Sequence, residues 1–296
     1  MNRYTPTPPE NFGGLPEEHS LYETSRAVIY PVPLDRTSAH KHGTCNGPAA
    51  ILSASRQIEL YDDELDAEPF KDIGIHTLAP IDTMDGTIEE VTTEIFTAGC
   101  SLLEDDKFPV ALGGEHALTP PLVAAVAKKF RSLSVLQIDA HANLRDTHHG
   151  SSLSHACTMR RVLELCPAVQ VGIRSLSIEE AQAIPHLRTK VYWARDIARA
   201  PLKSWIAKVL GDLSSNVYLT IDLDGFDPSI MPATSAPEPG GLDWHQVTSL
   251  IRAIGEHKKI VGMDVVELLP QPGQHACDRL AARLVYKCLG YAFCHA

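Results

Sequence analysis

The sequence predicts an α/β fold in which helices cover both faces of a mostly parallel sheet. Short runs rich in β-branched and apolar residues, at 108–112, 133–138 and 217–221, are bounded by polar residues in the manner of buried strands. Helix-like segments alternate with these runs along the chain. Such alternation is typical of parallel strands joined by helical crossovers, and it places functional side chains at the carboxyl ends of the strands.

The segment between residues 87 and 130 shows this alternation clearly. A capping box begins a helix at Thr87-Ile88-Glu89-Glu90. Apolar residues then recur at helical spacing, at Val91, Ile95 and Leu102. The strand-like run 108–112 follows, and a second helix is expected over 120–130. We therefore expect a helix, a strand and a helix in this order.

Polar side chains follow three of the predicted strands. His116 comes after two glycines, which let the backbone turn tightly. Residues i and i+2 of a strand point the same way, so two pairs of side chains, Asp139 with His141 and Asp222 with Asp224, are each aimed at one spot. Brought together at one edge of the sheet, these segments supply six candidate metal ligands: His116, Asp139, His141, Asn143, Asp222 and Asp224.

This mixture of carboxylates and imidazoles, without a thiolate, favours a hard or borderline ion such as Mn²⁺ over a structural zinc. Shared carboxylates suit a two-metal site, in which water is acidified at neutral pH. Each Asp alone is also compatible with a helix cap or a turn. Clustered carboxylates without a cation would, however, be opposed by several kcal/mol of repulsion and desolvation. We therefore expect two Mn²⁺ ions per subunit.

The length and charge of the chain limit its function. At 296 residues it is long enough for one large α/β domain, and the candidate ligands are spread too widely for two. We assign residues 22–296 to this domain and residues 1–21, rich in Pro, Gly and Glu, to an irregular N-terminal arm. The formal charge of −11 argues against binding nucleic acid or an anionic membrane, and it suits a small cationic substrate.

The sequence contains no targeting or disulfide signal. No apolar run approaches the roughly 20 residues of a membrane span, and the N-terminus lacks a signal-peptide pattern, so we expect a cytoplasmic protein. The seven cysteines lie without a Cys-x-x-Cys pair, which fits reduced, buried thiols. They are Cys45, Cys100, Cys157, Cys166, Cys277, Cys288 and Cys294.

Six motifs in a fixed order resemble those of the ureohydrolases, the arginase and agmatinase family. They are Gly113-Gly114-Glu115-His116, Asp139-Ala140-His141, Ser154-His155, Asp222-Leu223-Asp224-x-x-Asp227-Pro228, Pro237-Glu238-Pro239-Gly240-Gly241 and Asp264-Val265-Val266-Glu267-x-x-Pro270. The resemblance runs from about Val28 to the C-terminus. It is strongest to bacterial and archaeal agmatinases, through residues 59–62, 144–146, 154–161 and 171–175. It implies a three-layer α/β/α, arginase-like fold, and we also expect a homo-oligomer.

The resemblance implies a role for each candidate ligand. His116 would bind one metal ion and His141 the other. Two carboxylates, Asp139 and Asp222, would bridge the ions, and Asp224 would complete the second site. The sequence departs from the family at the remaining position, where Asn replaces Asp.

That residue, Asn143, can coordinate an ion through its carbonyl oxygen but brings no negative charge. The site that it shares with His116 is therefore expected to bind its ion more weakly. Glu267 matches the carboxylate that holds the guanidinium group of the substrate by charge-assisted hydrogen bonds. His155 matches a histidine that can shuttle a proton to the leaving amine. Taken alone, Glu267 is also compatible with a surface or capping role, and any one of the 14 histidines with a structural one.

We interpret the chain as a metal-dependent hydrolase of a guanidino compound, with agmatinase, which converts agmatine and water to putrescine and urea, as the leading hypothesis. His148 and His149 replace an aromatic and an acidic residue usual in agmatinases, and Ala236 replaces a Thr. A hydrolase of another guanidino compound and a catalytically weak homologue with a binding or regulatory role are the alternatives. Arginase is disfavoured because the chain lacks the Asn- and Thr-rich loop that arginases carry after Asp-x-His-x-Asp, and the altered loop at 147–151 favours another guanidino compound as the nearest alternative.

Overall fold

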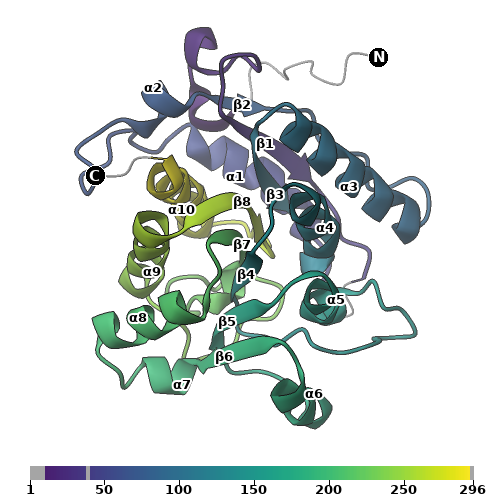
Figure 1. The fold of residues 1–296 in the computed structure, drawn as a ribbon. Coiled ribbons are helices and arrows are strands. Elements are labelled where there is room, and N and C mark those ends of the chain that lie inside the picture. The colour runs from purple at the N-terminus through teal and green to yellow at the C-terminus, as the bar shows by residue number, and fades with distance from the viewer. Residues whose placement is uncertain (1–10, 38–40, 294–296) are drawn as a thin grey trace.

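Residues 11–37 and 41–293 are described by a computed structural model, and they form three layers, with a sheet between two sets of helices (Figure 1). The sheet has eight strands in the order β2-β1-β3-β8-β7-β4-β5-β6, and all neighbouring strands are parallel. The expected fold class is confirmed. The strands are β1 (Ala27–Val32), β2 (Ile75–Thr77), β3 (Phe108–Gly113), β4 (Leu133–Ile138), β5 (Ala168–Ile173), β6 (Thr189–Trp193), β7 (Asn216–Asp222) and β8 (Lys259–Val266).

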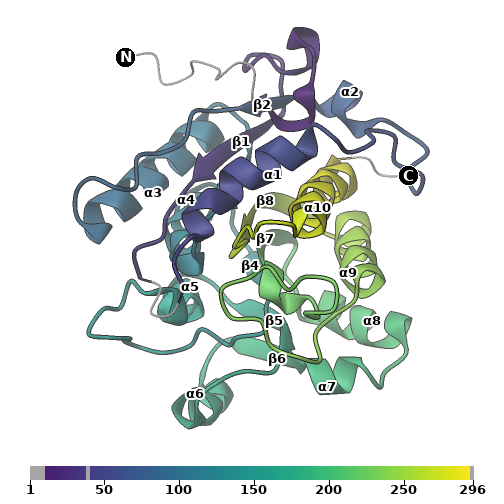
Figure 2. The ribbon, with the colours of Figure 1, turned by 180° about the vertical axis from the view of Figure 1, so that it is seen from behind.

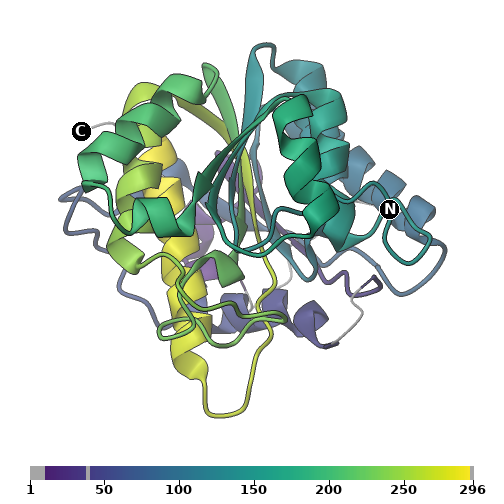
Figure 3. The ribbon, with the colours of Figure 1, turned by 90° about the horizontal axis from the view of Figure 1, so that it is seen from below.

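Helices cover both faces of the sheet, which is why its strands are apolar at nearly every position. Figure 2 shows α1 and α10 on one face, and Figure 3 shows the sheet edge-on between the two helical layers. Each face has its own apolar core, because alternate residues of β1 belong to different clusters: Ile29 to one, and Val28 and Tyr30 to the other. The helices are α1 (Gly47–Ser55), α2 (Pro69–Ile73), α3 (Ile88–Glu104), α4 (Thr119–Lys129), α5 (Thr158–Leu165), α6 (Ile178–Ala183), α7 (Ala194–Ile197), α8 (Leu202–Asp212), α9 (Trp244–His257) and α10 (His275–Phe293).

The elements expected from the sequence are present. The three predicted strands correspond to β3, β4 and β7, and the helix expected over 120–130 is α4, one residue earlier. The capping box before α3 is formed in both directions: the Glu90 N–H donates to Thr87 Oγ1 at 3.2 Å, and the Thr87 N–H donates to Glu90 Oε2 at 2.7 Å. Local sequence signals therefore fix the start of this helix.

The expected N-terminal arm, residues 1–21, is described from residue 11 onward, and residues 1–10 lie outside the described part. Residues 11–21 contain two short 3-10 helices, Phe12–Gly14 and Glu17–His19. Phe12 is buried in the core, and its N–H donates to Thr77 Oγ1 at 3.0 Å. Six cysteines are free thiols, and Cys294 lies outside the described residues. None of the helices described is both long and apolar enough to cross a membrane. The cytoplasmic location and the homo-oligomeric state stay predictions.

The centre of the sheet brings distant parts of the chain together at one edge. Strands β3, β8, β7 and β4 are neighbours, although β3 and β4 are separated from β7 and β8 in sequence. In the register of β4 and β7, Ile138 lies opposite Ile221. The residues that follow, Asp139 and Asp222, therefore leave the sheet side by side at its carboxyl edge, where ligands bind in open α/β sheets.

Substitutions at two helical glycines test how closely the helices of the outer layer pack. A Cβ added to Gly255 in α9 would lie 2.0 Å from the carbonyl oxygen of Tyr291 in α10. The resulting strain of about 1–3 kcal/mol outweighs the gain of about 1 kcal/mol in helix propensity. We expect Gly255→Ala to lower the free energy of unfolding, measured by urea denaturation. Gly211→Ala in α8, where a Cβ meets nothing within 4 Å, should raise it. Stabilisation by both variants would contradict the close helix contact.

Candidate metal centre

His116 is brought to the carboxyl edge of the sheet by the end of β3. It begins a short 3-10 helix, His116–Leu118, directly after Gly113-Gly114-Glu115. The glycines were expected to allow a tight turn, but neither has a positive φ. Their role is close approach: a Cβ on Gly114 would lie 2.0 Å from the carbonyl oxygen of Leu34, and one on Gly113 would lie 2.2 Å from Leu118 Cδ2.

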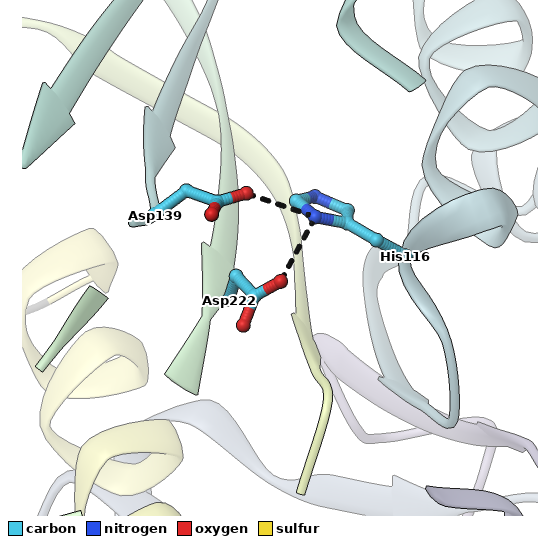
Figure 4. Close-up of side chains that lie close together, drawn as sticks. All are labelled: His116, Asp139 and Asp222. Atoms are coloured by element: carbon cyan, nitrogen blue, oxygen red, sulfur yellow. Dashed lines mark ion pairs between the residues drawn. The ribbon is translucent and has the colours of Figure 1, made fainter. Parts of the chain in front are cut away.

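The first group of candidate ligands consists of His116, Asp139 and Asp222 (Figure 4). His116 Nδ1 lies 3.2 Å from Asp139 Oδ2 and 3.2 Å from Asp222 Oδ2. All three side chains are buried, and they come from the ends of three different strands. The ring nitrogen and the two carboxylate oxygens therefore converge on one point.

The second group consists of Asp139, His141 and Asp224, so that Asp139 belongs to both groups. His141 Nδ1 lies 2.8 Å from Asp224 Oδ2 and 3.6 Å from Asp139 Oδ1. Asp222 and Asp224 were expected to point at one spot, and they fall in adjacent groups that share Asp139. The reason is local: β7 ends at Asp222, and Asp224 lies in a 3-10 helix, Leu223–Gly225, where the alternation of a strand no longer applies.

The electrostatics of these groups favour added positive charge. Burial, and then the charges of Asp224 and Asp139, raise the pKa of Asp222 well above its usual value. Burial opposes protonation of His141, but Asp224 and Asp139 together raise its pKa to about 12. The same balance, with Asp139 and Asp222 as the partners, raises the pKa of His116 well above its usual value. Both histidines are thus held as cations by carboxylates that need a counter-charge.

The donor set fits two divalent cations. Two groups that share a carboxylate, each with one imidazole, match the ligand types that hard or borderline ions accept. The shared Asp139 uses both oxygens: Oδ1 accepts the His141 N–H at 2.5 Å, and Oδ2 accepts Gln137 Nε2 at 2.6 Å. Partial positive charge from these donors thus already lies against this carboxylate.

Asn143 lies beside the first group. Its Nδ2 donates to Asp139 Oδ2 at 2.8 Å and lies 3.3 Å from His116 Nδ1. It is buried, with a left-handed backbone (φ 51°) that Asn tolerates better than most residues. The amide must turn to offer its carbonyl oxygen to an ion, and turning breaks its hydrogen bond to Asp139. An ion in the first group would therefore meet both this competition and the missing charge.

The His116 ring is oriented through its Nε2 by a buried hydroxyl, which is itself held by a buried carboxylate. Its Nε2 lies 2.8 Å from Thr220 Oγ1, which donates to Asp264 Oδ1 at 2.7 Å. Asp264 also accepts the hydroxyls of Tyr218 at 2.8 Å and Thr119 at 3.1 Å. Since the Thr220 proton is used toward Asp264, His116 Nε2 must carry a proton, so Nδ1 is the nitrogen that would release its proton to bind a metal ion.

Glu267 closes the floor of the site from β8. Its Oε1 accepts the His116 N–H at 2.9 Å, and its Oε2 accepts the hydroxyl of Ser235 at 2.5 Å. Its backbone is left-handed, with φ 66°, and the side chain is buried. Burial raises the pKa of Glu267 to about 7 despite these hydrogen bonds. A cation placed against this carboxylate would therefore favour its charged form.

His155 lies on the opposite wall, at the start of the 3-10 helix His155–Cys157. Its Nδ1 lies 3.1 Å from Thr37 Oγ1, so Nε2 is the ring nitrogen left for a substrate. Burial, followed by the nearby His148, His116 and His141, lowers the pKa of His155 to about 4. The imidazole is therefore neutral at neutral pH.

A pocket of about 380 Å³ opens above both groups. The sequence-predicted residues that line it are His116, His141, Asn143, Asp222, Asp224, His155, Glu267, His148, His149 and Ala236. Asp139 lies beneath them, fully buried. The structure thus brings all eight predicted site residues, six ligands and two catalytic candidates, to one place.

Sequence reasoning missed three polar residues of this site. Thr220 lies two positions before Asp222 on the same strand face, so strand alternation would have indicated it. Glu180 lines the pocket and is the last residue of a capping box, Ser177-x-x-Glu180, that is visible in the sequence. Ser235 had no such signal, because it lies in an irregular loop.

Comparison with known proteins gives a consistent result over nearly the whole chain. A sequence model described as the arginase family matches residues 25–290. The chain is 39% identical over 282 residues to the N(1)-aminopropylagmatine ureohydrolase of Synechocystis sp., covering 93% of this chain and 92% of the relative. It is 34% identical over 258 residues to the agmatinase of Bacillus cereus, covering 86% and 87%. The crystal structure of the agmatine ureohydrolase of Thermoplasma volcanium has a TM-score of 0.82 at 27% identity, covering 92% of this chain and 91% of that one.

Asn143→Asp tests the assignment of the first group. The variant gains an anionic ligand, so we expect its weaker Mn²⁺ to bind about tenfold to a hundredfold more tightly, as for a charge-assisted bond of roughly 1.5 to 3 kcal/mol. Titration calorimetry over a range of Mn²⁺ concentrations measures the change, with the tighter ion as the internal control. Unchanged affinity for both ions would remove Asn143 from the ligand set.

Thr220→Val tests the orientation of His116. Without the hydroxyl, the ring loses the partner that fixes its tautomer, and we expect a loss of about tenfold to a hundredfold in affinity for the same ion. Thr220→Ser keeps the hydroxyl and should restore the affinity. Tyr218→Phe removes a different hydroxyl from Asp264 and is the matched control. An equal loss in Thr220→Val and Tyr218→Phe would point to Asp264 as the sole cause.

Proposed function

Because the chain belongs to the arginase family of hydrolases that act on guanidino or amidino groups, we propose that it releases urea from a linear guanidino amine. The observation that carries this proposal is the pair of buried His/Asp groups on the floor of a pocket that also holds the carboxylate of Glu267. A centre for two cations suits attack of water on an unreactive carbon, and a buried carboxylate suits a guanidinium group.

Each group would hold one divalent cation; Asp139 belongs to both groups, and the family resemblance implies that Asp222 would serve both as well. When bound, the cations would activate water for attack at neutral pH. We propose Mn²⁺ as the ion, since oxygen and imidazole donors without thiolate suit it. The proposed ligands are His116, Asp139, Asp222 and Asn143 for the weaker site, and His141, Asp139, Asp222 and Asp224 for the tighter one.

Glu267 would hold the guanidinium group of the substrate. Its two oxygens already accept hydrogen bonds from the His116 N–H and the Ser235 hydroxyl, so its carboxylate cannot rotate freely. Each oxygen retains a further lone pair for a guanidinium N–H. The planar group would thus be fixed above the His/Asp groups by charge-assisted bonds.

His155 would move the proton that the reaction must transfer. Water adds to the guanidinium carbon, the bond from that carbon to the alkylated nitrogen breaks, and both water protons end on the leaving nitrogen, which departs as an ammonium group. A neutral imidazole with a bare Nε2 can accept one of these protons and deliver it to that nitrogen. The products are urea and the amine, and His155 returns to its starting state.

On the pocket wall, Glu180 offers a carboxylate for a cationic tail, beside the basic side chains of Lys41 and Arg145. Glu180 lines the pocket and is buried, and its oxygens accept the N–H groups of Leu144 and Ser177, both at 2.8 Å. Burial lowers the pKa of His148, and the neutral imidazole can accept a hydrogen bond from an ammonium group. Agmatine carries such a group. N(1)-aminopropylagmatine is the second candidate, favoured by the 39% identity to the Synechocystis sp. ureohydrolase.

Urea release from a panel of guanidino compounds with added Mn²⁺ tests the proposal. We expect agmatine or N(1)-aminopropylagmatine to give the highest kcat/KM and arginine to give a lower value, because its α-carboxylate cannot pair with Glu180 as an ammonium group can. In Glu267→Gln, kcat/KM for the best substrate should fall by about a hundredfold, the loss of a charge-assisted bond of roughly 3 kcal/mol.

Glu238→Gln is the matched control for this variant. It removes a carboxylate from the loop next to Ser235 that does not line the pocket, and its kcat/KM should stay within about twofold. Metal binding should be equal in both variants. No urea from any compound at saturating Mn²⁺ would instead favour a catalytically weak homologue, and an undiminished rate in Glu267→Gln would remove Glu267 from the catalytic residues.

A further inference from the structure

We propose that Thr37 is a positioning residue, which holds His155 in one tautomer and one orientation through a hydrogen-bond relay to the buried carboxylate of Glu115. The proposal rests on the proposed function, because a proton-transfer role for His155 gives its tautomer a consequence. The relay crosses the pocket wall and joins two segments 78 residues apart in sequence.

The hydroxyl of Thr37 makes three contacts. It donates to Glu115 Oε2 at 2.9 Å, it accepts the backbone N–H of His155 at 3.0 Å, and it lies 3.1 Å from His155 Nδ1. A hydroxyl has one proton to donate and two lone pairs that accept. The three contacts therefore use its whole hydrogen-bonding capacity.

The directions of these hydrogen bonds fix which ring nitrogen of His155 carries the proton. A carboxylate only accepts hydrogen bonds, so the Thr37 proton points at Glu115. Toward His155 the hydroxyl must then accept, and Nδ1 must be the nitrogen that carries the proton. The lone pair on Nε2 is left for the substrate. The same logic fixes the histidine of a catalytic triad, where loss of the orienting partner lowers kcat by up to about 10⁴.

Glu115 is a rigid anchor for the relay. Its side chain is fully buried. Its oxygens also accept the backbone N–H of Arg36 at 3.1 Å and that of Thr37 at 2.8 Å, and its own N–H donates to the Leu34 carbonyl oxygen at 2.7 Å. Glu115 immediately precedes His116, so the relay ties the orientation of His155 to the strand end that presents a candidate metal ligand.

A purely structural role for Thr37 makes a different prediction. The His155 N–H is the first donor of a 3-10 helix and needs an acceptor, which the Thr37 hydroxyl supplies. If that were its only role, another hydroxyl that holds the same loop should matter equally. Thr83 offers this control: its hydroxyl donates to the carbonyl oxygen of Pro33 at 2.7 Å, and it does not line the pocket.

The kinetic test compares Thr37→Val, Thr37→Ser and Thr83→Val in the Mn²⁺-loaded protein, with the best substrate of the guanidino panel. We expect Thr37→Val to lower kcat by about tenfold to a hundredfold, part of the 10²–10⁴ that a positioned acid or base contributes, with KM changed by less than about threefold. Thr37→Ser should restore most of the lost kcat. Thr83→Val should lower the melting temperature without this loss. Thr37→Ala replaces Thr37→Val should the latter fail to fold.

A double-mutant cycle separates positioning from structure. If Thr37 acts through His155, Thr37→Val should cause no further loss of kcat in a His155→Asn background. An additive loss, or a loss of equal size in Thr83→Val, would overturn the proposal.

A second readout does not depend on activity. In the Zn²⁺-loaded protein with ¹⁵N-labelled histidine, ring correlations identify the tautomer of His155, assigned by their absence in His155→Asn. We expect the Nδ1-protonated form in the natural protein and a shift toward the Nε2-protonated form in Thr37→Val. Absence of urea release with this shift present would refute the proposed function and keep the relay. Urea release with the same tautomer in both proteins would refute the relay.

Discussion

Three buried carboxylates at the ends of two neighbouring strands are the constraint on which the rest of the site depends. The register of β4 and β7 forces Asp139 and Asp222 together, and Asp224 follows one turn later. Burial and mutual repulsion disfavour their charged forms, and ion pairs with His116 and His141 offset part of this cost. A chain that keeps these carboxylates must bring positive charge to this edge of the sheet, and this requirement is what makes the cluster a binding site.

His116 and His155 have different proposed roles, but their rings are oriented in the same way. His116 contacts Thr220, whose hydroxyl donates to Asp264, and His155 contacts Thr37, whose hydroxyl donates to Glu115. In both cases the carboxylate fixes the direction of the hydroxyl proton, and the hydroxyl then fixes the tautomer of the ring. The nitrogen left for a ligand is Nδ1 in His116, which must first give up its proton, and Nε2 in His155. Buried polar groups of the core thereby decide which nitrogen each ring presents to the pocket.

Much of this arrangement followed from the sequence, because strand ends of a parallel sheet converge. The apolar runs located β3, β4 and β7, and the polar residues directly after them proved to be neighbours in space. Two features could not be predicted in this way. The 3-10 helix after β7 sends Asp224 to the second group, and periodicity contains no signal for such a turn. Thr37 reaches Glu115 over 78 residues, where Gly114 lets the two segments approach closely, and periodicity contains no signal for such a contact.

Asn143 decides how the charge of the site is balanced. An Asp at this position would place a fourth carboxylate beside the three buried ones, and a cation would be held more firmly. The amide instead donates to Asp139 Oδ2, an oxygen that an ion in the first group would also need. The hydrogen bond stabilises the site before an ion arrives and competes with the ion afterwards. On the proposed assignment, Asn in place of Asp would lower the cost of keeping the carboxylates buried and would also lower the affinity for the first ion, whereas Asp would raise both.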